Sequence, residues 1–240
     1  LPATLQTPAK RCRSRSHEAS PAEIKRPESG NFYAAMEGSP MTSHQMRALL
    51  LTAHGSPLLL QSIERPAPAE GQVLVRIKAS GVNPLDLKIS KGQAAHARHP
   101  LPAILGIDLA GIVDSVGAGV TNFRPGDEVY GMTGGVGGLQ GSLAEFVAAD
   151  ARLLAKKPKN LGMREAAALP LIFITAWEGL VDRAHVRAGQ KVLVHGGAGG
   201  VGHMAVQLAR AFDAALYATG SRKNKAYIEH LGAVFIDRET

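Results

Sequence analysis

Residues 191–202 read KVLVHGGAGGVG, an apolar run followed by a segment in which five of the eight residues from His195 to Gly202 are glycine. The run KVLV predicts a buried strand, and the segment GVGHMAVQLARAF predicts an amphipathic helix. Between them the glycines form a G-x-G-x-x-G pattern, which is much more specific in this setting than glycine richness alone. The placement predicts a turn whose backbone approaches a dinucleotide pyrophosphate at a helix N-terminus.

Each glycine of the pattern receives a physical role. We expect Gly197 to permit a tight turn, Gly199 to let backbone N–H groups approach the pyrophosphate, and Gly202 to let the helix pack against the strand. A second cluster, GGVGGLQG at 134–141, lacks this spacing and a following amphipathic helix, so we interpret it as a flexible surface loop. The cofactor contacts predicted at the turn are Gly197, Gly199, Gly200, Val201 and Gly202.

The segment after the second strand, ALYATG, indicates which nucleotide binds. An NAD site usually has an acid there for the ribose hydroxyls, whereas here Gly220 is followed by Ser221, Arg222, Lys223 and Lys225. A hydroxyl and cations hold a 2′-phosphate, which a carboxylate would repel. We therefore predict NADP(H), with Gly220, Ser221, Arg222 and Lys225 as contacts. The alternative is a basic helix start that faces solvent.

The rhythm of the chain predicts two kinds of domain. Short alternating strands separated by Pro and Gly turns favour a β-rich, barrel-like catalytic domain over 46–165. A helical segment with a break at Pro170 follows, and from about residue 190 strands alternate with helices. That alternation predicts a parallel, doubly wound sheet, of which 166–240 holds about three strands and thus only part of a nucleotide-binding domain.

Composition limits the remaining possibilities. Residues 1–45 lack hydrophobic periodicity and predict a disordered tail, or sequence upstream of the true start, rather than a targeting peptide. Cys12 is the only cysteine, which excludes intrachain disulfides and multi-cysteine zinc sites and suits a cytoplasmic setting. No apolar run is long enough for a membrane span, and the net charge of +7 is too scattered to indicate a specific nucleic-acid partner.

Four ordered blocks resemble one known family. The blocks are ASGVNPLDLKISKG, LGIDLAGIVDSVGAGVTNFRPGDEVYG, AALPLIFITAWEGL and GQKVLVHGGAGGVGHMAVQLAR. They are similar to the zinc-independent, zeta-crystallin-like quinone oxidoreductases of the medium-chain dehydrogenase/reductase superfamily, from about Met46 to Arg238. The resemblance implies a GroES-like β-barrel catalytic domain followed by a Rossmann domain, here C-terminally truncated, and a homodimer for the full-length form.

The resemblance also bears on metal. Zinc alcohol dehydrogenases carry Gly-His-Glu where this chain reads Gly106-Ile107-Asp108, and their first cysteine ligand aligns with Asn83. Catalytic zinc needs about three protein ligands, and Ile107 and Asn83 supply no usable pair. The pair His96 and His99 has helical spacing but lies in a segment that we interpret as a polar surface loop. We therefore predict no metal site.

The family's functional positions transfer to a few residues. Asn83 corresponds to a position near the nicotinamide ribose, and Thr175 either contacts the cofactor or bonds its own helix backbone. Lys88 replaces a tyrosine that faces substrate in many relatives; it either stabilises an oxyanion or points to water, and we favour water. Asp86 is expected to cap the NPLD turn, and Arg238 to compensate for a missing aromatic residue near the cofactor phosphate.

These expectations combine into one leading function and several alternatives. The leading function is NADPH-dependent hydride transfer to a quinone or an α,β-unsaturated carbonyl, with Asn83 and Lys88 as candidate catalytic residues. An enoyl-thioester reductase and a zinc-type alcohol dehydrogenase relative are the rival enzymes. A non-catalytic NADPH-binding protein and an inactive fragment are the alternatives from another class.

Overall fold

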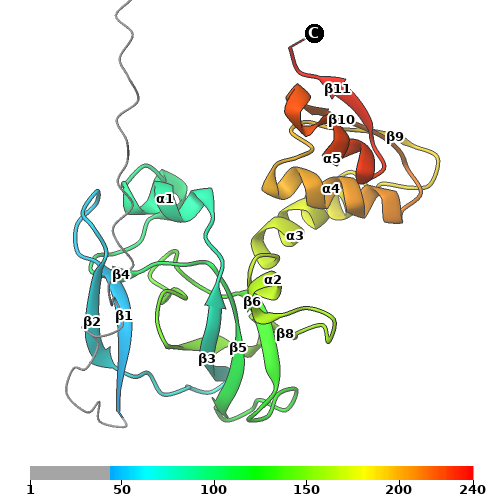
Figure 1. Cartoon of the computed structure of the whole chain (residues 1–240). Helices are drawn as coiled ribbons and strands as arrows, with labels where there is room; N and C mark the ends of the chain where they lie inside the picture. The colour runs from blue at the N-terminus through cyan, green and yellow to red at the C-terminus, as the bar shows by residue number, and fades with distance from the viewer. Residues whose placement is uncertain (1–43, 240) are drawn as a thin grey trace, which may run out of the picture. The chain divides into compact units, whose positions relative to one another are not determined.

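Residues 44–239 are described by the structure, which is a computed structural model (Figure 1). The predicted tail therefore lies outside the described residues, except that Gln45 already begins the first strand. No helix within the described part of the chain combines the length and the apolar character that a bilayer crossing requires.

Two antiparallel sheets form the first half of the described residues. Their strands are β1 (Gln45–Leu51), β2 (Leu59–Glu64), β3 (Gln72–Ser80), β4 (Ala103–Ile104), β5 (Asp108–Val116), β6 (Glu128–Met132), β7 (Phe146–Asp150) and β8 (Leu154–Lys156). One sheet has the order β2-β1-β4 and the other β7-β3-β5-β6-β8. These strands are two to nine residues long, which agrees with the short strands predicted for this part of the chain.

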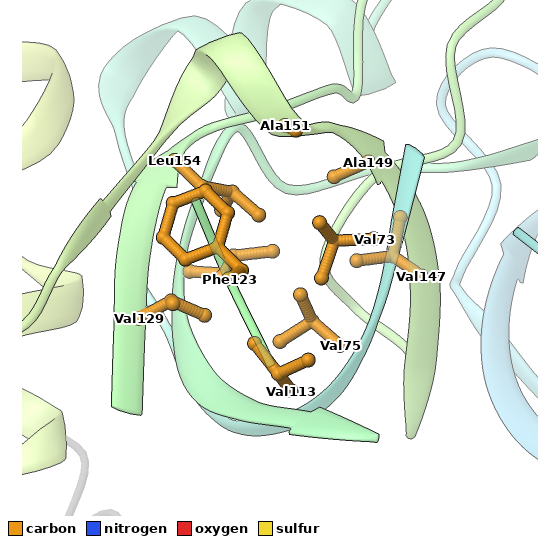
Figure 2. Close-up of a cluster of buried hydrophobic side chains, with 10 residues drawn as sticks. Val73, Val75, Val113, Phe123, Val129, Val147, Ala149, Ala151 and Leu154 are labelled. Atoms are coloured by element: carbon orange, nitrogen blue, oxygen red, sulfur yellow. The ribbon is translucent and has the colours of Figure 1, made fainter. Parts of the chain in front are cut away.

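The five-stranded sheet curls into a barrel. Its two edge strands, β7 and β8, are joined by only three residues, Ala151–Leu153, so the edges must approach one another. Figure 2 shows the labelled side chains pointing toward one another inside the curved strands. Alternate positions such as Val73 and Val75 are fully buried because successive strand residues face opposite sides. The barrel-like β domain predicted from the sequence is confirmed.

Short helices border the barrel. They are α1 (Pro84–Ser90), α2 (Met163–Ala167) and α3 (Pro170–Trp177), and a π-helical segment, Glu178–Arg183, continues α3. Pro170 occupies the first turn of α3, where its missing N–H costs nothing, and this confirms the predicted break. Ala166 and Ala167 of α2 pack with Ala110 of β5, so α2 packs with the β-rich part of the chain.

The second half is a parallel sheet with helices between its strands. The elements are β9 (Lys191–Val194), α4 (Gly200–Ala211), β10 (Ala215–Gly220), α5 (Lys225–His230) and β11 (Val234–Asp237), and the sheet order is β11-β10-β9 (Figure 1). Val206 and Ile228 from the two helices are fully buried against the strands. Leu193 and Val234 are at least half exposed on the described structure. The predicted strand–helix alternation is confirmed.

The second glycine cluster, 134–141, is exposed in its middle, at Gly137, Gly138 and Leu139, as expected of a surface loop, but its two ends are packed, which we did not predict. Gly134, Gly135 and Gly141 are buried, and a Cβ at Gly141 would overlap the carbonyl oxygen of Leu105. The Gly141 N–H also donates to the Ile104 oxygen at 2.9 Å. These glycines allow two stretches of backbone to approach closely, a requirement that depends on tertiary contacts.

The turn between β9 and α4 uses its glycines somewhat differently from the prediction. The left-handed backbone conformation lies at Gly196 (φ 69°), not at Gly197, to which we had assigned the tight turn. Gly197 is required because a Cβ there would lie 2.6 Å from the Ala218 side chain on β10. At Gly202 a Cβ would overlap the Gly196 carbonyl oxygen, so this glycine does allow the helix to approach the strand end.

Substitution at two glycines of this turn distinguishes a position where packing excludes a Cβ atom from one where it does not. We expect Gly202→Ala to lower the free energy of unfolding by at least about 2 kcal/mol, because the new methyl group overlaps fixed backbone. Gly200→Ala is the matched control, since its Cβ would meet only the Ile172 side chain, at 3.4 Å. It should change stability by less than about 1 kcal/mol. Urea unfolding followed by circular dichroism measures both, and equal losses would contradict the steric assignment.

Candidate functional site

The predicted cofactor residues of the glycine turn gather at the carboxyl end of the parallel sheet. Gly199 is the N-cap of α4, and the first turn of that helix contains Gly200, Val201 and Gly202, whose N–H groups have no partner within the helix. Gly199, Gly200 and Val201 are exposed. The backbone therefore offers several donors and the positive end of a helix dipole at one accessible place, which fits a pyrophosphate.

The strand beside the turn holds it in place. Thr219, near the end of β10, accepts a hydrogen bond from the Gly196 N–H through its hydroxyl at 3.1 Å. Its carbonyl oxygen accepts from the Gly197 N–H at 2.9 Å. Two backbone donors of the turn are thus fixed by one residue of the neighbouring strand, a role of Thr219 that we did not predict.

A salt bridge lies where we expected only cations. Nε of Arg222 donates to Oδ2 of Asp237, the last residue of β11, at 3.0 Å. Hydrogen bonds from the Glu239 N–H and from Arg222 lower the pKa of Asp237, so the carboxyl is ionised. Lys225 lies within 3.9 Å of Glu229 on the exposed side of α5. The NADP(H) prediction considered only the segment after β10 and missed this acid from the next strand.

Asn83 belongs to a second group of predicted residues, built around a buried carboxylate. Its Nδ2 donates to Oδ2 of Asp108 at 3.0 Å, and Oδ1 of Asp108 accepts from the Leu171 N–H at 3.0 Å. Asp108 is 0% exposed and Asn83 is 6% exposed. The carboxylate therefore joins the start of α1, the start of β5 and the first turn of α3.

Electrostatics at this carboxylate are set by its burial. Burial raises the pKa of Asp108 to about 6, hydrogen bonds from Asn83 and from the Leu171 N–H oppose the rise, and the Asp86 carboxyl adds to it. Burial likewise raises the pKa of Asp86, against backbone N–H groups that face it. Oδ2 of Asp86 accepts from the Asn83 N–H at 2.7 Å, which confirms its expected capping role.

Thr175 and Lys88 take the less reactive of the positions considered for them. The Thr175 hydroxyl donates to the Leu171 carbonyl oxygen, one turn earlier in α3, at 2.7 Å. Its hydroxyl is thus bonded to its own helix, although Leu171 links it to the Asp108 group. Lys88 is exposed in the last turn of α1, as we favoured. Arg238 is also exposed, and its N–H donates to the Gly220 oxygen.

An apolar cavity of about 430 Å³ borders the Asp108 group. Leu85 lies two residues after Asn83, Ile107 precedes Asp108, and Leu171 binds Asp108 through its N–H; all three side chains line the cavity. Its further lining includes Met132, Thr133, Val136, Leu139 and Leu153, with His96 and Arg98. The size and lining suit a small, mostly apolar organic molecule.

The histidine pair has a structural explanation. Our placement of His99 on a polar surface loop was wrong, because His99 is 8% exposed and its Nδ1 accepts from the Gly138 N–H at 2.9 Å. Burial lowers the pKa of His99, which keeps the ring neutral. Within residues 44–239 no three His, Cys, Asp or Glu side chains come together in an arrangement suited to a metal ion.

The residues that sequence reasoning missed share one property: their partners are distant in sequence. Asp108 pairs with Asn83 and Leu171, and Asp237 pairs with Arg222. One local signal was available for Asp108, since an acid inside the apolar run ILGIDLAGIV is costly to bury without partners. For Thr219 and Asp237 the strand end alone carries no comparable signal.

The titration of Asp108 predicts the direction in which the stability of the fold changes with pH. The folded chain holds this proton up to about pH 6, whereas the unfolded chain releases it near its ordinary value of 3.8. The group therefore favours the folded state at low pH, and that contribution is lost as pH rises toward 6. Relative to wild type, Asp108→Asn should gain up to about 3 kcal/mol between about pH 4 and pH 7, measured by urea unfolding across pH.

Asp150→Asn is the matched control. Hydrogen bonds from Arg152 lower the pKa of the partly buried Asp150 to about 2, so this variant should lose relative stability as pH rises through the acid range. A constant offset between Asp108→Asn and wild type at every pH would contradict the assigned pKa of Asp108. The size of the stability difference at any single pH also reflects the altered hydrogen bond to Asn83, so only the change of this difference with pH tests the pKa.

Comparison with known proteins places this geometry in a family. Residues 69–159 match the alcohol dehydrogenase GroES-like domain. The chain is 42% identical over 211 residues to a 2-methylene-furan-3-one reductase of Solanum lycopersicum, covering 83% of this chain and 54% of the relative. It is 40% identical over 198 residues to an NADPH-dependent alkenal/one oxidoreductase, chloroplastic, of Arabidopsis thaliana, covering 79% and 51%.

Solved structures agree with these relatives. An alcohol dehydrogenase superfamily protein from Novosphingobium aromaticivorans has a TM-score of 0.80 at 57% identity, covering 81% of this chain and 59% of that one. The quinone oxidoreductase from Coxiella burnetii has a TM-score of 0.73 at 32% identity, covering 81% and 63%. The chain spans about half the length of the curated relatives described above. With its GroES-like barrel and Rossmann-like sheet, the chain belongs to the quinone oxidoreductase-like branch of the medium-chain dehydrogenase/reductase superfamily.

Proposed function

We propose that the chain carries the cofactor turn and part of the substrate pocket of an NADPH-dependent reductase that transfers hydride to a quinone or an α,β-unsaturated carbonyl without zinc. The observation that carries this proposal is the glycine turn before α4, whose sterics admit no Cβ at Gly197 or Gly202. A turn so constrained at a helix N-terminus binds the pyrophosphate of a dinucleotide. Two relatives are named as reductases of alkenals/alkenones and of a 2-methylene-furan-3-one, which supports the same chemistry.

The two groups of predicted residues meet through α3. A Cβ at Gly200 would lie 3.4 Å from Ile172, while Leu171, its neighbour in α3, binds Asp108. A dinucleotide held at Gly199–Gly202 therefore lies beside the helix that also borders the apolar cavity. In this proposal the nicotinamide end extends along α3 toward Asn83, and the substrate occupies the cavity lined by Ile107 and Leu171.

The chain's own residues have simple tasks in such a reaction. The N-terminus of α4 holds the pyrophosphate, and Asp108 fixes Asn83 and the start of α3 so that the reactants are aligned. The cofactor, when bound, supplies a hydride. The apolar cavity excludes water, and a hydrogen-bond donor in its wall stabilises the charge that develops on the carbonyl oxygen. A proton from solvent completes the reduction.

Selectivity for NADP(H) is assigned to the cations after β10. Ser221, Arg222 and Lys225 surround the end of that strand, and Arg222 is already held there by Asp237. We further propose that Asn83 and Ile107, which occupy the positions of zinc ligands in zinc-dependent relatives, make the reaction independent of zinc.

The proposed boundary between the two domains follows Ala167, because α2 packs with β5.

The setting and assembly follow from composition and resemblance. We propose a cytoplasmic location, since the single cysteine suits a reducing compartment. We also propose that the full-length form is a homodimer and that it has no specific nucleic-acid partner, because the basic residues are dispersed.

The central experiment follows cofactor oxidation. The chain should oxidise NADPH faster than NADH in the presence of quinones and α,β-unsaturated carbonyls, by about tenfold or more in kcat/KM, and EDTA should leave the rate unchanged. Absorbance of the reduced cofactor measures both. An activity that EDTA abolishes and Zn²⁺ restores would instead assign the chain to zinc-dependent chemistry. NADPH binding without any acceptor-dependent oxidation would identify a binding protein.

A pair of arginine variants tests the nucleotide assignment. Arg222→Ala should weaken NADPH binding about tenfold, because a charge-assisted hydrogen bond to the 2′-phosphate is lost, and should change NADH binding less than about twofold. Arg187→Ala is the control, since Arg187 is also exposed but precedes β9 and lies at the opposite end of the parallel strands. Calorimetric titration measures the dissociation constants of NADPH and NADH for each variant. Equal weakening of both nucleotides by Arg222→Ala would refute a role in 2′-phosphate recognition.

A further inference from the structure

Thr133 has an unsatisfied hydroxyl in a buried position. Its side chain is 5% exposed, and its Oγ1 has no hydrogen-bond partner among the described residues. Buried hydroxyls are normally paired, because a donor removed from water without a partner costs free energy. By contrast, the hydroxyls of Thr175 and Thr219 are both hydrogen-bonded. The Thr133 hydroxyl therefore lacks a hydrogen-bond partner that the described residues could supply.

The position of Thr133 connects it with the proposed substrate cavity. It follows β6 directly, and its N–H donates to the Ile107 carbonyl oxygen at 2.9 Å, which extends the pairing of β5 with β6. Both Thr133 and Ile107 line the apolar cavity of about 430 Å³. Thr133, the residue with the unsatisfied hydroxyl, therefore lines the cavity next to the Asp108 group.

The other polar side chains of the cavity have different surroundings. His96 and Arg98 are exposed, so water competes for their hydrogen bonds. Around Thr133 the lining is apolar, with Met132, Val136 and Leu139 close in sequence. A hydrogen bond made in such surroundings is stronger than one made in water, because little solvent screens it.

We propose that the Thr133 hydroxyl donates a hydrogen bond to the carbonyl oxygen of a small, uncharged, mostly apolar ketone, enone or quinone bound in this cavity. This inference rests on the proposed function for the reaction that follows, but the binding itself requires no cofactor. As hydride reaches the acceptor, negative charge collects on the same oxygen, and the bond strengthens.

Binding of two ligands that differ at one atom isolates the hydroxyl. The ligands are benzylideneacetone and the hydrocarbon in which a methylene group replaces its carbonyl oxygen, each titrated into the full chain by NMR without NADPH. Wild type should bind the ketone about tenfold more tightly than the hydrocarbon, since one buried hydrogen bond distinguishes them. Thr133→Val should remove this preference, and Thr133→Ser should keep it.

The melting temperature distinguishes a ligand-binding role of the Thr133 hydroxyl from a purely structural one. Valine has the shape of threonine without the hydroxyl, so Thr133→Val should melt at or above the wild-type temperature. Thr219→Val is the matched control: it breaks the hydrogen bond with the Gly196 N–H and should melt lower while retaining the preference for the ketone. A clear drop in melting temperature for Thr133→Val would show that the hydroxyl already has a protein partner and would overturn the proposal.

The remaining outcomes are also decisive. A wild-type chain that binds both ligands equally or binds neither, or a Thr133→Val variant that still prefers the ketone, would overturn the proposal. Because no cofactor is present, a ketone preference that depends on Thr133 would support it even if NADPH oxidation failed. In that case the proposed function alone would be rejected.

Discussion

The carboxylate of Asp108 is the interaction on which the arrangement of the site depends. It is fully buried, and the two hydrogen bonds described for it, from Asn83 and from the Leu171 N–H, come from two other segments of the chain. A buried carboxylate is tolerated only when its oxygens are well satisfied, so both donors are held in place. Removal of either one would leave a buried acceptor without its partner.

This constraint extends from the barrel to the parallel sheet. Leu171 lies in the first turn of α3, and Ala176, near the end of that helix, packs in the core that β9, β10 and α4 share. Ile172 lies against the first residue of α4, beside the glycine turn. The carboxylate thus fixes the start of a helix whose other residues contact the cofactor turn. In the hydride transfer that we propose, this linkage contributes to the alignment of donor and acceptor.

Sequence patterns predicted the regular elements well and the contacts between them poorly. The period of KVLV and of the following helix predicted β9 and α4, since these patterns are local. Glycine spacing predicted the turn and gave Gly197 the role of permitting it, whereas the left-handed conformation lies at Gly196, because spacing does not give φ. The burial of His99 and of the two ends of the loop 134–141 was missed, since it depends on contacts with other segments of the chain.

Asp237 shows how such a distant contact changes the meaning of a local pattern. The segment after β10 contains no acid, yet the parallel pairing of Gly220 with Asp237 brings one to the same place. Its effect on a bound 2′-phosphate has two parts with opposite signs. The carboxylate repels the phosphate, but it also holds the Arg222 guanidinium, so less side-chain entropy remains to be lost on binding. Lys223 and Lys225 are exposed nearby and keep the local charge positive. In the NADP(H) site that we propose, the acid therefore positions Arg222 among cations and does not create a site for a ribose hydroxyl.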